Sequence, residues 1–229
     1  MSLTGKRIAI TGAFGSLGAA VVQTALAVGA RVAAIDRADE PPAGIDLGAA
    51  GRFGGIDLAD ADQAKAALDE AAMTMGGLDA LVNIAGTFRF ETLVDGGAET
   101  WDLLYRVNLR TAVAASKAAL AHLPDGGRIV NIGAAGALKA GAGMGAYAAS
   151  KSGVMRFTES LAEELKPRGI TVNAVLPSII DTPPNRRDMP KADFGKWVKP
   201  SQLADVIVFL LSDQASAITG ALIPVTGRV

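Results

Sequence analysis

The feature that most restricts the fold of this chain is a regular alternation between two kinds of segment. Short runs rich in Val, Ile and Ala have few polar positions, which predicts strands buried on both faces of a sheet. The longer stretches between them carry apolar residues at helical spacing. Clear strand candidates span 6–11, 30–36, 78–85, 127–133, 170–177 and 221–227, with a weaker one at 52–58, and helices are predicted over 16–28, 60–74, 99–122, 146–166 and 201–212.

This alternation predicts βαβ units, a parallel sheet and right-handed crossovers. We therefore expect an α/β fold in which residues 1–229 form a single doubly wound Rossmann domain, with about seven strands and with helices on both faces. No linker rich in serine or charge divides the chain, so one domain is the simplest organisation. Segment 178–200 holds four prolines and is longer than most connections, which indicates a functional loop that contacts substrate.

Composition excludes several kinds of site. The chain has no cysteine, which rules out disulfides, thiolate catalysis and cysteine zinc sites. Its single histidine, His122, lies in a helical pattern where a structural role is expected. We therefore predict no metal. The formal net charge of −1 gives no general attraction to nucleic acid or to anionic lipid.

The first apolar run imitates an export signal, because Lys6 and Arg7 precede a long uncharged stretch that ends in small residues. Glycines at structured spacing within that stretch, and its direct continuation into the strand at 30–36, favour a globular domain instead. With no other targeting signal, a cytoplasmic location is the default expectation, and no membrane span is predicted.

The segment after the first strand reads TGAFGSLG and places Gly12, Gly15 and Gly18 at the start of a helix. A helix N-terminus offers free N–H groups and a positive dipole end to a pyrophosphate, and glycines let the backbone approach it. The spacing alone also suits a plain strand–helix turn. Asp36 ends the second strand. A carboxylate at this position can be an ordinary polar strand end, or it can bind the adenosine ribose and repel the 2′-phosphate of NADP. This predicts NAD(H), with NADP(H) second. Arg37 weakens the preference, because an Arg can pair with a phosphate.

Tyr147 and Lys151 are four residues apart, which places them on one face of a helix. The ordinary pKa of a tyrosine is about 10, and a nearby ammonium is expected to lower it. Tyr147 is thus a candidate general acid tuned by Lys151. The same spacing also arises by chance, from a core aromatic beside a surface lysine. Segment 131–146 is mostly Gly and Ala and offers no hydroxyl near the tyrosine, and Ser150 lies too close to Tyr147 on the helix to serve.

With further motifs, these residues resemble those of the short-chain dehydrogenases/reductases along nearly the whole chain. NIAG at 83–86 resembles the family's NNAG, with Ile84 in place of one Asn. The resemblance implies that Tyr147, Lys151 and Asn108 are catalytic, with Lys151 also holding the nicotinamide ribose and Asn108 supporting a relay water, unless Asn108 only bonds locally. The cofactor-binding residues that it implies are Gly12, Phe14, Gly15, Ser16, Leu17, Gly18, Asp36, Arg37, Asp57, Leu58, Asn83, Ala85, Gly86, Tyr147, Lys151, Pro177, Ile180 and Thr182.

The departure from the family is Ala134, at a position where most members carry a Ser. In ketone reduction Ser and Tyr both donate hydrogen bonds to the substrate oxygen, and losing such a donor typically costs about 10²–10³ in rate. The missing Ser and the segment DTPPNRRDMPKADFGKW (181–197) together resemble dihydropteridine reductase, in which NADH reduces a quinonoid dihydropterin. Protonation of a ring nitrogen develops no alkoxide, so a second donor to oxygen is not needed. The expected substrate contacts are Ala134, Met144, Pro184, Phe194 and Trp197, although Phe194 and Trp197 are equally compatible with packing of the loop.

Three hypotheses on function remain open, because fold analogy alone does not decide among them. The first is an NADH-dependent oxidoreductase that transfers hydride to a quinonoid dihydropterin or a similar conjugated heteroaromatic ring, with Tyr147 as proton donor. The second, favoured by Asn108 and NIAG, acts on a ketone, an alcohol or a 3-oxoacyl thioester without the usual Ser. The third is an NAD-binding sensor or scaffold, against which the intact Tyr147 and Lys151 argue. The resemblance also implies a homodimer or homotetramer built on helices 99–122 and 146–166.

Overall fold

The computed structural model describes residues 2–229. It confirms the predicted α/β fold: seven parallel strands form one sheet in the order β3-β2-β1-β4-β5-β6-β7. The order turns back at β1, which pairs with β2 on one side and with β4 on the other. The strands are β1 (Arg7–Thr11), β2 (Arg31–Ile35), β3 (Gly51–Phe53), β4 (Ala80–Asn83), β5 (Arg128–Ile132), β6 (Thr171–Pro177) and β7 (Leu222–Val225).

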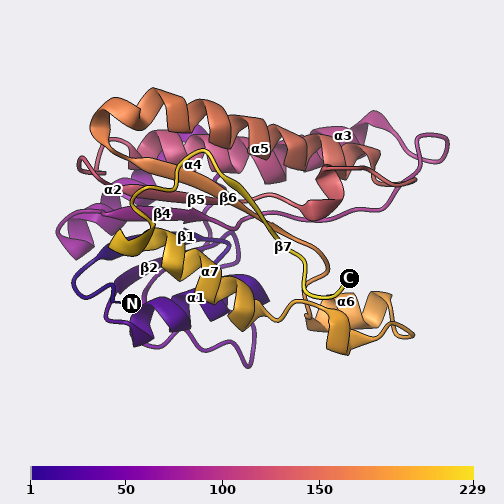
Figure 1. The fold of residues 1–229 in the computed structure, drawn as a ribbon, viewed down its shortest axis with the longest axis horizontal. Coiled ribbons are helices and arrows are strands. Elements are labelled where there is room, and N and C mark those ends of the chain that lie inside the picture. Colours follow the sequence, from indigo (N-terminus) through magenta and orange to yellow (C-terminus); the bar gives the residue numbers. More distant parts are fainter. Residues whose placement is uncertain (1) are drawn as a thin grey trace.

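Helices cover both faces of the sheet (Figure 1). One layer is formed by α1 (Ser16–Ala27) and α7 (Pro200–Leu211), which pack against each other. The other layer is formed by α2 (Ala61–Met75), α4 (Thr111–Ala119) and α5 (Gly145–Leu165). Two short helices lie outside these layers: α3 (Ala98–Leu104) leads into the second layer, and α6 (Pro183–Asp188) follows β6. No helix among residues 2–229 is both long enough and apolar enough to cross a membrane.

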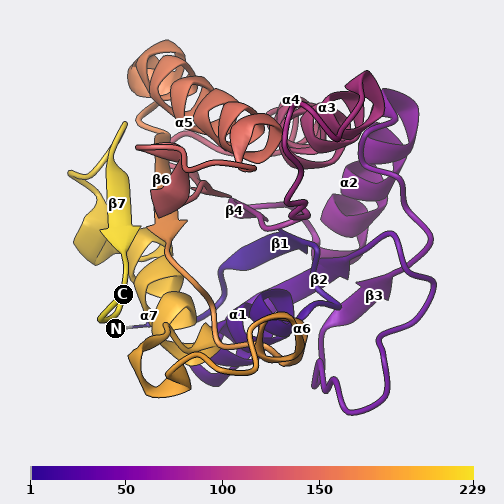
Figure 2. The same ribbon diagram turned by 90° about the vertical axis from the view of Figure 1, so that its right-hand side faces the viewer.

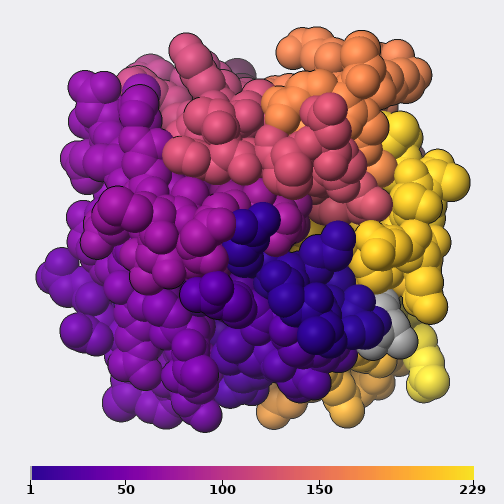
Figure 3. All heavy atoms as spheres, turned by 90° about the vertical axis from the view of Figure 1, so that its left-hand side faces the viewer, coloured from indigo at the N-terminus to yellow at the C-terminus, as the bar shows by residue number. Residues whose placement is uncertain are grey.

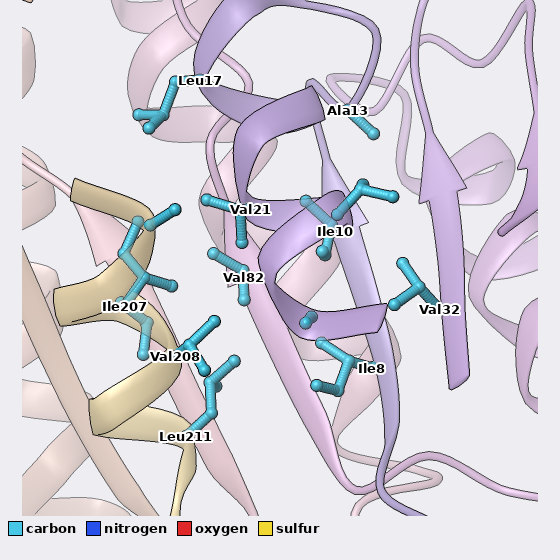
Figure 4. Close-up of a cluster of buried hydrophobic side chains, with 14 of the residues drawn as sticks. Ile8, Ile10, Ala13, Leu17, Val21, Val32, Val82, Ile207, Val208 and Leu211 are labelled. Atoms are coloured by element: carbon cyan, nitrogen blue, oxygen red, sulfur yellow. The ribbon is translucent and has the colours of Figure 1, made fainter. Parts of the chain in front are cut away.

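The apolar strand runs are explained by burial on both sides. Ile8 and Ile10 of β1 point into the core beneath α1 and α7, together with Val21 and Ile207 (Figure 4). Ala9, between the two isoleucines, belongs to the core on the other face. Successive side chains of a strand alternate between faces, so a strand between two helical layers needs apolar residues at every position.

Three predicted elements differ from the observed ones. The helix predicted over 99–122 is interrupted by a π-helical turn at Tyr105–Arg110 between α3 and α4. The weak strand predicted over 52–58 is reduced to β3. Segment 178–200 is not a plain loop, because it contains α6. Thr182 caps that helix by accepting a hydrogen bond from the N–H of Asn185 (3.4 Å), and prolines occupy its first turn, where the missing N–H costs nothing.

The carboxyl ends of the strands all lie at one edge of the sheet, and Figure 2 looks towards this edge, with α6 in front of the sheet. Figure 3 shows the opposite side of the molecule, where N-terminal atoms (indigo) and C-terminal atoms (yellow) lie side by side. In open parallel sheets, ligands bind outside the carboxyl ends, where the strand order reverses. The fold therefore directs the search for a site to the region beyond β1 and β4.

Candidate active site

A cavity of about 1300 Å³ lies at this edge. Its wall is built from the segments that follow β1, β2, β4, β5 and β6, so residues far apart in sequence meet there. The predicted coenzyme residues in the wall are Gly12, Phe14, Gly15, Leu17, Gly18, Asp36, Arg37, Asp57, Leu58, Ala85, Gly86, Tyr147, Lys151, Pro177 and Ile180.

Three of the predicted coenzyme residues do not line the cavity. Ser16 begins α1. Asn83 is buried in the sheet, where its amide donates hydrogen bonds to Asn131 Oδ1 (2.8 Å) and Ser116 Oγ (3.0 Å). Thr182 caps α6. The structure therefore gives Asn83 and Thr182 a role in holding the strands and the loop in place.

The glycines of the turn after β1 are explained by different structural requirements. Gly12 has a φ of +64°, and a Cβ there would lie 2.7 Å from the backbone nitrogen of Ala85. A Cβ on Gly18 would lie 2.2 Å from the carbonyl oxygen of Gly12. Gly15 is different, since the nearest atom to an added Cβ is 3.5 Å away. Gly12 and Gly18 thus let the turn pack tightly, whereas Gly15 leaves open space at the N-terminus of α1, which fits a pyrophosphate cradle.

Asp36 fastens the end of β2 to the glycine turn. Its carboxylate accepts hydrogen bonds from the backbone N–H of Phe14 (2.9 Å) and of Ala38 (3.0 Å). Arg37, beside it, lines the cavity and makes no ion pair among residues 2–229. A carboxylate and a free guanidinium therefore stand side by side where the adenosine ribose would bind.

Arg106 is a cavity residue that sequence reasoning missed. Its guanidinium donates to the carboxylate of Asp57 at 2.5 Å, and both residues line the cavity. Arg106 belongs to the π-helical turn that also carries Asn108. The contact is not readable from spacing, because 49 residues separate the partners.

Asn108 connects two segments of the site. It is 1% exposed, and its Oδ1 accepts a hydrogen bond from the N–H of Thr87 (2.7 Å). Its Nδ2 donates to Ser150 Oγ (2.9 Å), and Ser150 donates in turn to the carbonyl oxygen of Tyr147 (2.8 Å). These partners lie on other elements, so Asn108 does not bond only locally. It positions the segment after β4 against α5.

Tyr147 and Lys151 share one face of α5, as the spacing predicted. Lys151 is 5% exposed, and its ammonium donates to the carbonyl oxygen of Ile132 (2.8 Å). Burial lowers the pKa of Lys151 to about 8. Burial also raises the pKa of Tyr147 to about 12. The predicted lowering of the tyrosine pKa is therefore wrong for the protein without ligands, because burial disfavours the phenolate.

The substrate side of the cavity contains Ala134 and Met144, two of the predicted contacts. It does not contain Pro184, Phe194 or Trp197. Trp197 is 5% exposed, and its ring lies 4.8 Å from that of Phe194, so these two rings pack the loop rather than face the cavity.

Two aromatic side chains that sequence reasoning missed take their place. Phe88 and Phe90 follow the NIAG segment and line the cavity. The ring of Phe88 meets that of Tyr147 edge-on, with centroids 4.9 Å apart. Phe90 lies against Gly143, where an added Cβ would fall 2.4 Å from the ring. Aromatic residues directly after NIAG were the available signal, but only the fold brings them to the tyrosine.

Fold and site together are those of a nucleotide-binding oxidoreductase, with the predicted pair Tyr147 and Lys151 in the wall of the cavity. The chain belongs to the short-chain dehydrogenases/reductases: residues 12–227 match the family model described as Enoyl-(Acyl carrier protein) reductase. Curated relatives of the chain are oxidoreductases of the short-chain dehydrogenase/reductase class, and the chain is an enzyme of the same class.

Two curated relatives align over almost the whole chain. The sequence is 36% identical to 2-(S)-hydroxypropyl-CoM dehydrogenase 3 of Xanthobacter autotrophicus, over 98% of this chain and 96% of the relative. It is 34% identical to the 3-oxoacyl-[acyl-carrier-protein] reductase FabG of Thermotoga maritima, over 99% of this chain and 98% of the relative. The narrower resemblance to dihydropteridine reductase is not shown by these comparisons.

Solved structures give the same family. A short-chain dehydrogenase of Burkholderia cenocepacia in complex with NADP is 33% identical, with a TM-score of 0.86 over 99% of this chain and 98% of that one. A blue fluorescent protein from a metagenomic library, in complex with NADPH, is 33% identical, with a TM-score of 0.89 over 100% of this chain and 99% of that one. Both hold a nicotinamide dinucleotide, the kind of ligand that the glycine turn fits.

Proposed function

We propose that the protein catalyses the nicotinamide-dependent interconversion of a ketone and a secondary alcohol. The observation that carries this proposal is the meeting of Tyr147, Lys151 and the Asn108 hydrogen-bond chain at the wall of a cavity whose other end is a pyrophosphate cradle. The names of both curated relatives describe this conversion, in one as a hydroxypropyl dehydrogenase and in the other as a 3-oxoacyl reductase. This support favours the second of the three hypotheses over the dihydropterin hypothesis.

The proton chemistry follows from the state of Tyr147. With its pKa raised to about 12, Tyr147 is protonated at neutral pH and is ready to act as an acid. Reduced nicotinamide, when bound, would supply the hydride that the carbonyl carbon accepts. As the C=O electron pair moves to oxygen, Tyr147 transfers its proton to that oxygen. Lys151 stands one turn along α5, and its charge stabilises the phenolate that Tyr147 leaves behind.

We propose NADH as the preferred coenzyme. The Asp36 carboxylate at the end of β2 supports this, because it can accept hydrogen bonds from ribose hydroxyls and repels a 2′-phosphate. The two solved structures with NADP and NADPH, and the free guanidinium of Arg37, support the opposite choice. Comparison of kcat/KM for NADH and NADPH decides between them.

A conjugated heteroaromatic substrate such as a quinonoid dihydropterin is the second candidate. Two observations favour it. Ala134, 4% exposed in the cavity wall, supplies no hydroxyl for an alkoxide. The exposed rings of Phe88 and Phe90 offer faces on which a flat ring can stack.

One assay separates these candidates. NADH and NADPH oxidation is followed with a small ketone, a 3-oxoacyl thioester and chemically generated quinonoid dihydropterin, with Tyr147→Phe as the background for each. We expect turnover of a carbonyl compound. Turnover of the dihydropterin alone would replace the proposal with the second candidate. Tight NADH binding with no turnover of any substrate would favour the sensor or scaffold hypothesis.

We also propose that the protein forms a homo-oligomer through the layer that contains α4 and α5. Trp101, Tyr105 and Val113 are large apolar side chains that are 42%, 56% and 38% exposed along α3, the π-helical turn and α4. Exposed apolar side chains on neighbouring elements commonly mark a protein interface. Light scattering after size exclusion measures the assembly, and a monomer at all concentrations would contradict this proposal.

A further inference from the structure

The hydroxyl that Ala134 lacks has a candidate replacement elsewhere in the cavity wall. Four hydroxyl side chains line the cavity: those of Tyr147, Thr87, Thr111 and Ser178. Thr111 donates to the carbonyl oxygen of Val107 (2.7 Å), and Ser178 donates to that of Thr226 (2.7 Å). Within residues 2–229, the hydroxyl of Thr87 has no hydrogen-bond partner. Apart from Tyr147, Thr87 is therefore the cavity hydroxyl that is free to bind a ligand.

The backbone around Thr87 is tied to the proton donor. Three hydrogen bonds run from the N–H of Thr87 through Asn108 and Ser150 to the carbonyl oxygen of Tyr147. The next residue, Phe88, places its ring 4.9 Å from the ring of Tyr147. The chain at Thr87 is thus linked to Tyr147 in two ways, through Asn108 and Ser150 and through the neighbouring ring of Phe88.

The other polar side chains nearby are less suited to contact an alkoxide. Lys151 is committed to the carbonyl oxygen of Ile132, and the amide of Asn185 donates to Ile180. Arg89 makes no ion pair within residues 2–229, and like Thr87 it is exposed and lines a second hollow beside Asp188. Arg89 is therefore the alternative donor, and a variant at this position tests it.

We propose that the Thr87 hydroxyl is the second hydrogen-bond donor to the substrate oxygen, in place of the Ser that Ala134 replaces. This inference rests on the proposed carbonyl reduction. In that reaction the carbonyl carbon accepts the hydride from reduced nicotinamide, and the C=O electron pair moves to oxygen. Tyr147 transfers its proton to that oxygen, while Thr87 keeps its own proton and donates a hydrogen bond to the developing charge. In this protein the second donor lies on the segment after β4, whereas the usual Ser of the family would lie on the segment after β5.

The test is a double-mutant cycle on Thr87→Val and Ala134→Ser, measured with the ketone on which the natural protein is most active. Valine matches threonine in shape and keeps the N–H that binds Asn108. We expect Thr87→Val to lower kcat by about 10²-fold, the effect of losing one donor to a developing oxyanion. The Kd for NADH, measured by coenzyme fluorescence, should not change. Ala134→Ser should restore the Thr87→Val variant but add little to the natural protein.

Two controls separate a chemical role from a structural one. Thr24→Val makes the same substitution outside the cavity wall, at a hydroxyl that donates to the carbonyl oxygen of Ala20 (2.9 Å), and should leave kcat within about twofold because no donor to substrate is lost. Arg89→Met removes the free donor two residues from Thr87, and is expected to raise KM rather than lower kcat. Unchanged kcat in Thr87→Val, or a gain from Ala134→Ser that is equal with and without Thr87, would overturn the inference. A kcat loss in Arg89→Met but not in Thr87→Val would overturn it too. Absence of any carbonyl turnover in the natural protein would instead contradict the proposed function.

Discussion

The two ends of the cavity are held by different kinds of contact. At the coenzyme end, formed by residues 12–18, 36–37 and 57–58, backbone packs directly against backbone at Gly12 and Gly18, and the Asp36 carboxylate fastens the turn through the N–H of Phe14. At the substrate end, formed by residues 84–90, 134–144 and 178–189, side chains make the wall, and several of them are exposed. The Phe88 ring, which touches Tyr147, is 51% exposed.

This difference explains why the two ends differ in how far their ligand can be inferred. A backbone cradle admits few sequences, so its ligand can be predicted from glycine positions and one acid. A wall of loop side chains changes its shape with each substitution while the fold stays the same. The predictions below test whether the ends behave as separately as their contacts imply.

The largest loss of activity is expected at Tyr147, in the wall of the cavity. Tyr147→Phe should lower kcat by about 10²–10⁴-fold, because it removes the general acid, while NADH binding and the melting temperature stay nearly unchanged. Stopped-flow or steady-state NADH oxidation measures the loss, and coenzyme fluorescence measures binding. Tyr105→Phe is the matched control, since Tyr105 is the other tyrosine in the chain and is 56% exposed. Equal losses in both variants would show that the effect is not local to the site.

The next effect tests whether backbone packing governs the coenzyme end. In Gly18→Ala the new Cβ would lie 2.2 Å from the carbonyl oxygen of Gly12, so the turn must shift. We expect a loss of stability of about 1–3 kcal/mol, as for other overpacked positions, together with weaker NADH binding. Gly15→Ala is the control, because its Cβ meets only one atom, at 3.5 Å.

Gly15→Ala should keep the melting temperature and still weaken NADH binding, since its Cβ enters the space of the pyrophosphate. Thermal unfolding and coenzyme titration on the two variants separate these effects. If both variants lost the same stability, packing would not distinguish the two glycines.

The two ends of the cavity also differ in how much of their structure could be predicted from the sequence. The strands, the layers and the glycine turn after β1 could be predicted, because apolar periodicity and glycine spacing report backbone requirements. The π-helical turn could not be predicted, because Asn108 within it bonds to Thr87 and Ser150, and the local helical pattern carries no sign of contacts so distant in sequence. Phe194 and Trp197 were expected in the cavity wall, where the structure instead has Phe88 and Phe90, since composition does not show which way a loop folds.

A third, smaller effect concerns stability and the buried ammonium of Lys151. Lys151→Met should raise the stability of the protein without coenzyme by about 1–3 kcal/mol at pH 7, while catalysis falls, because a buried ammonium costs more than its one hydrogen bond returns. The sign depends on pH. Lys151 has a pKa of about 8 when folded and 10.5 when unfolded, so below pH 8 the charge is present in both states and its burial penalty is complete.

Between pH 8 and pH 10.5 the folded protein releases this proton and the unfolded chain keeps it, so the penalty is relieved as pH rises. The stability gain of Lys151→Met should therefore be largest below pH 8 and shrink towards pH 10.5. Urea unfolding of both proteins across this range measures it. A gain that does not vary with pH would indicate that Met packs better for reasons unrelated to charge.

The smallest expected effect is on the preference between NADH and NADPH. It tests whether Asp36, at the coenzyme end, can be substituted without changing the substrate end. Asp36→Ser removes the carboxylate that repels a 2′-phosphate and leaves Arg37 free to pair with one, so kcat/KM should shift from NADH towards NADPH by about 10-fold. Asp39→Ser is the control, because it removes the same charge from an exposed position that does not line the cavity. The ketone KM should stay the same in both variants, since Asp36 contacts Phe14 and Ala38 rather than the substrate wall. If the natural protein already prefers NADPH, Arg37 and not Asp36 dominates this end, and Arg37→Ala should then be the variant that reverses the preference.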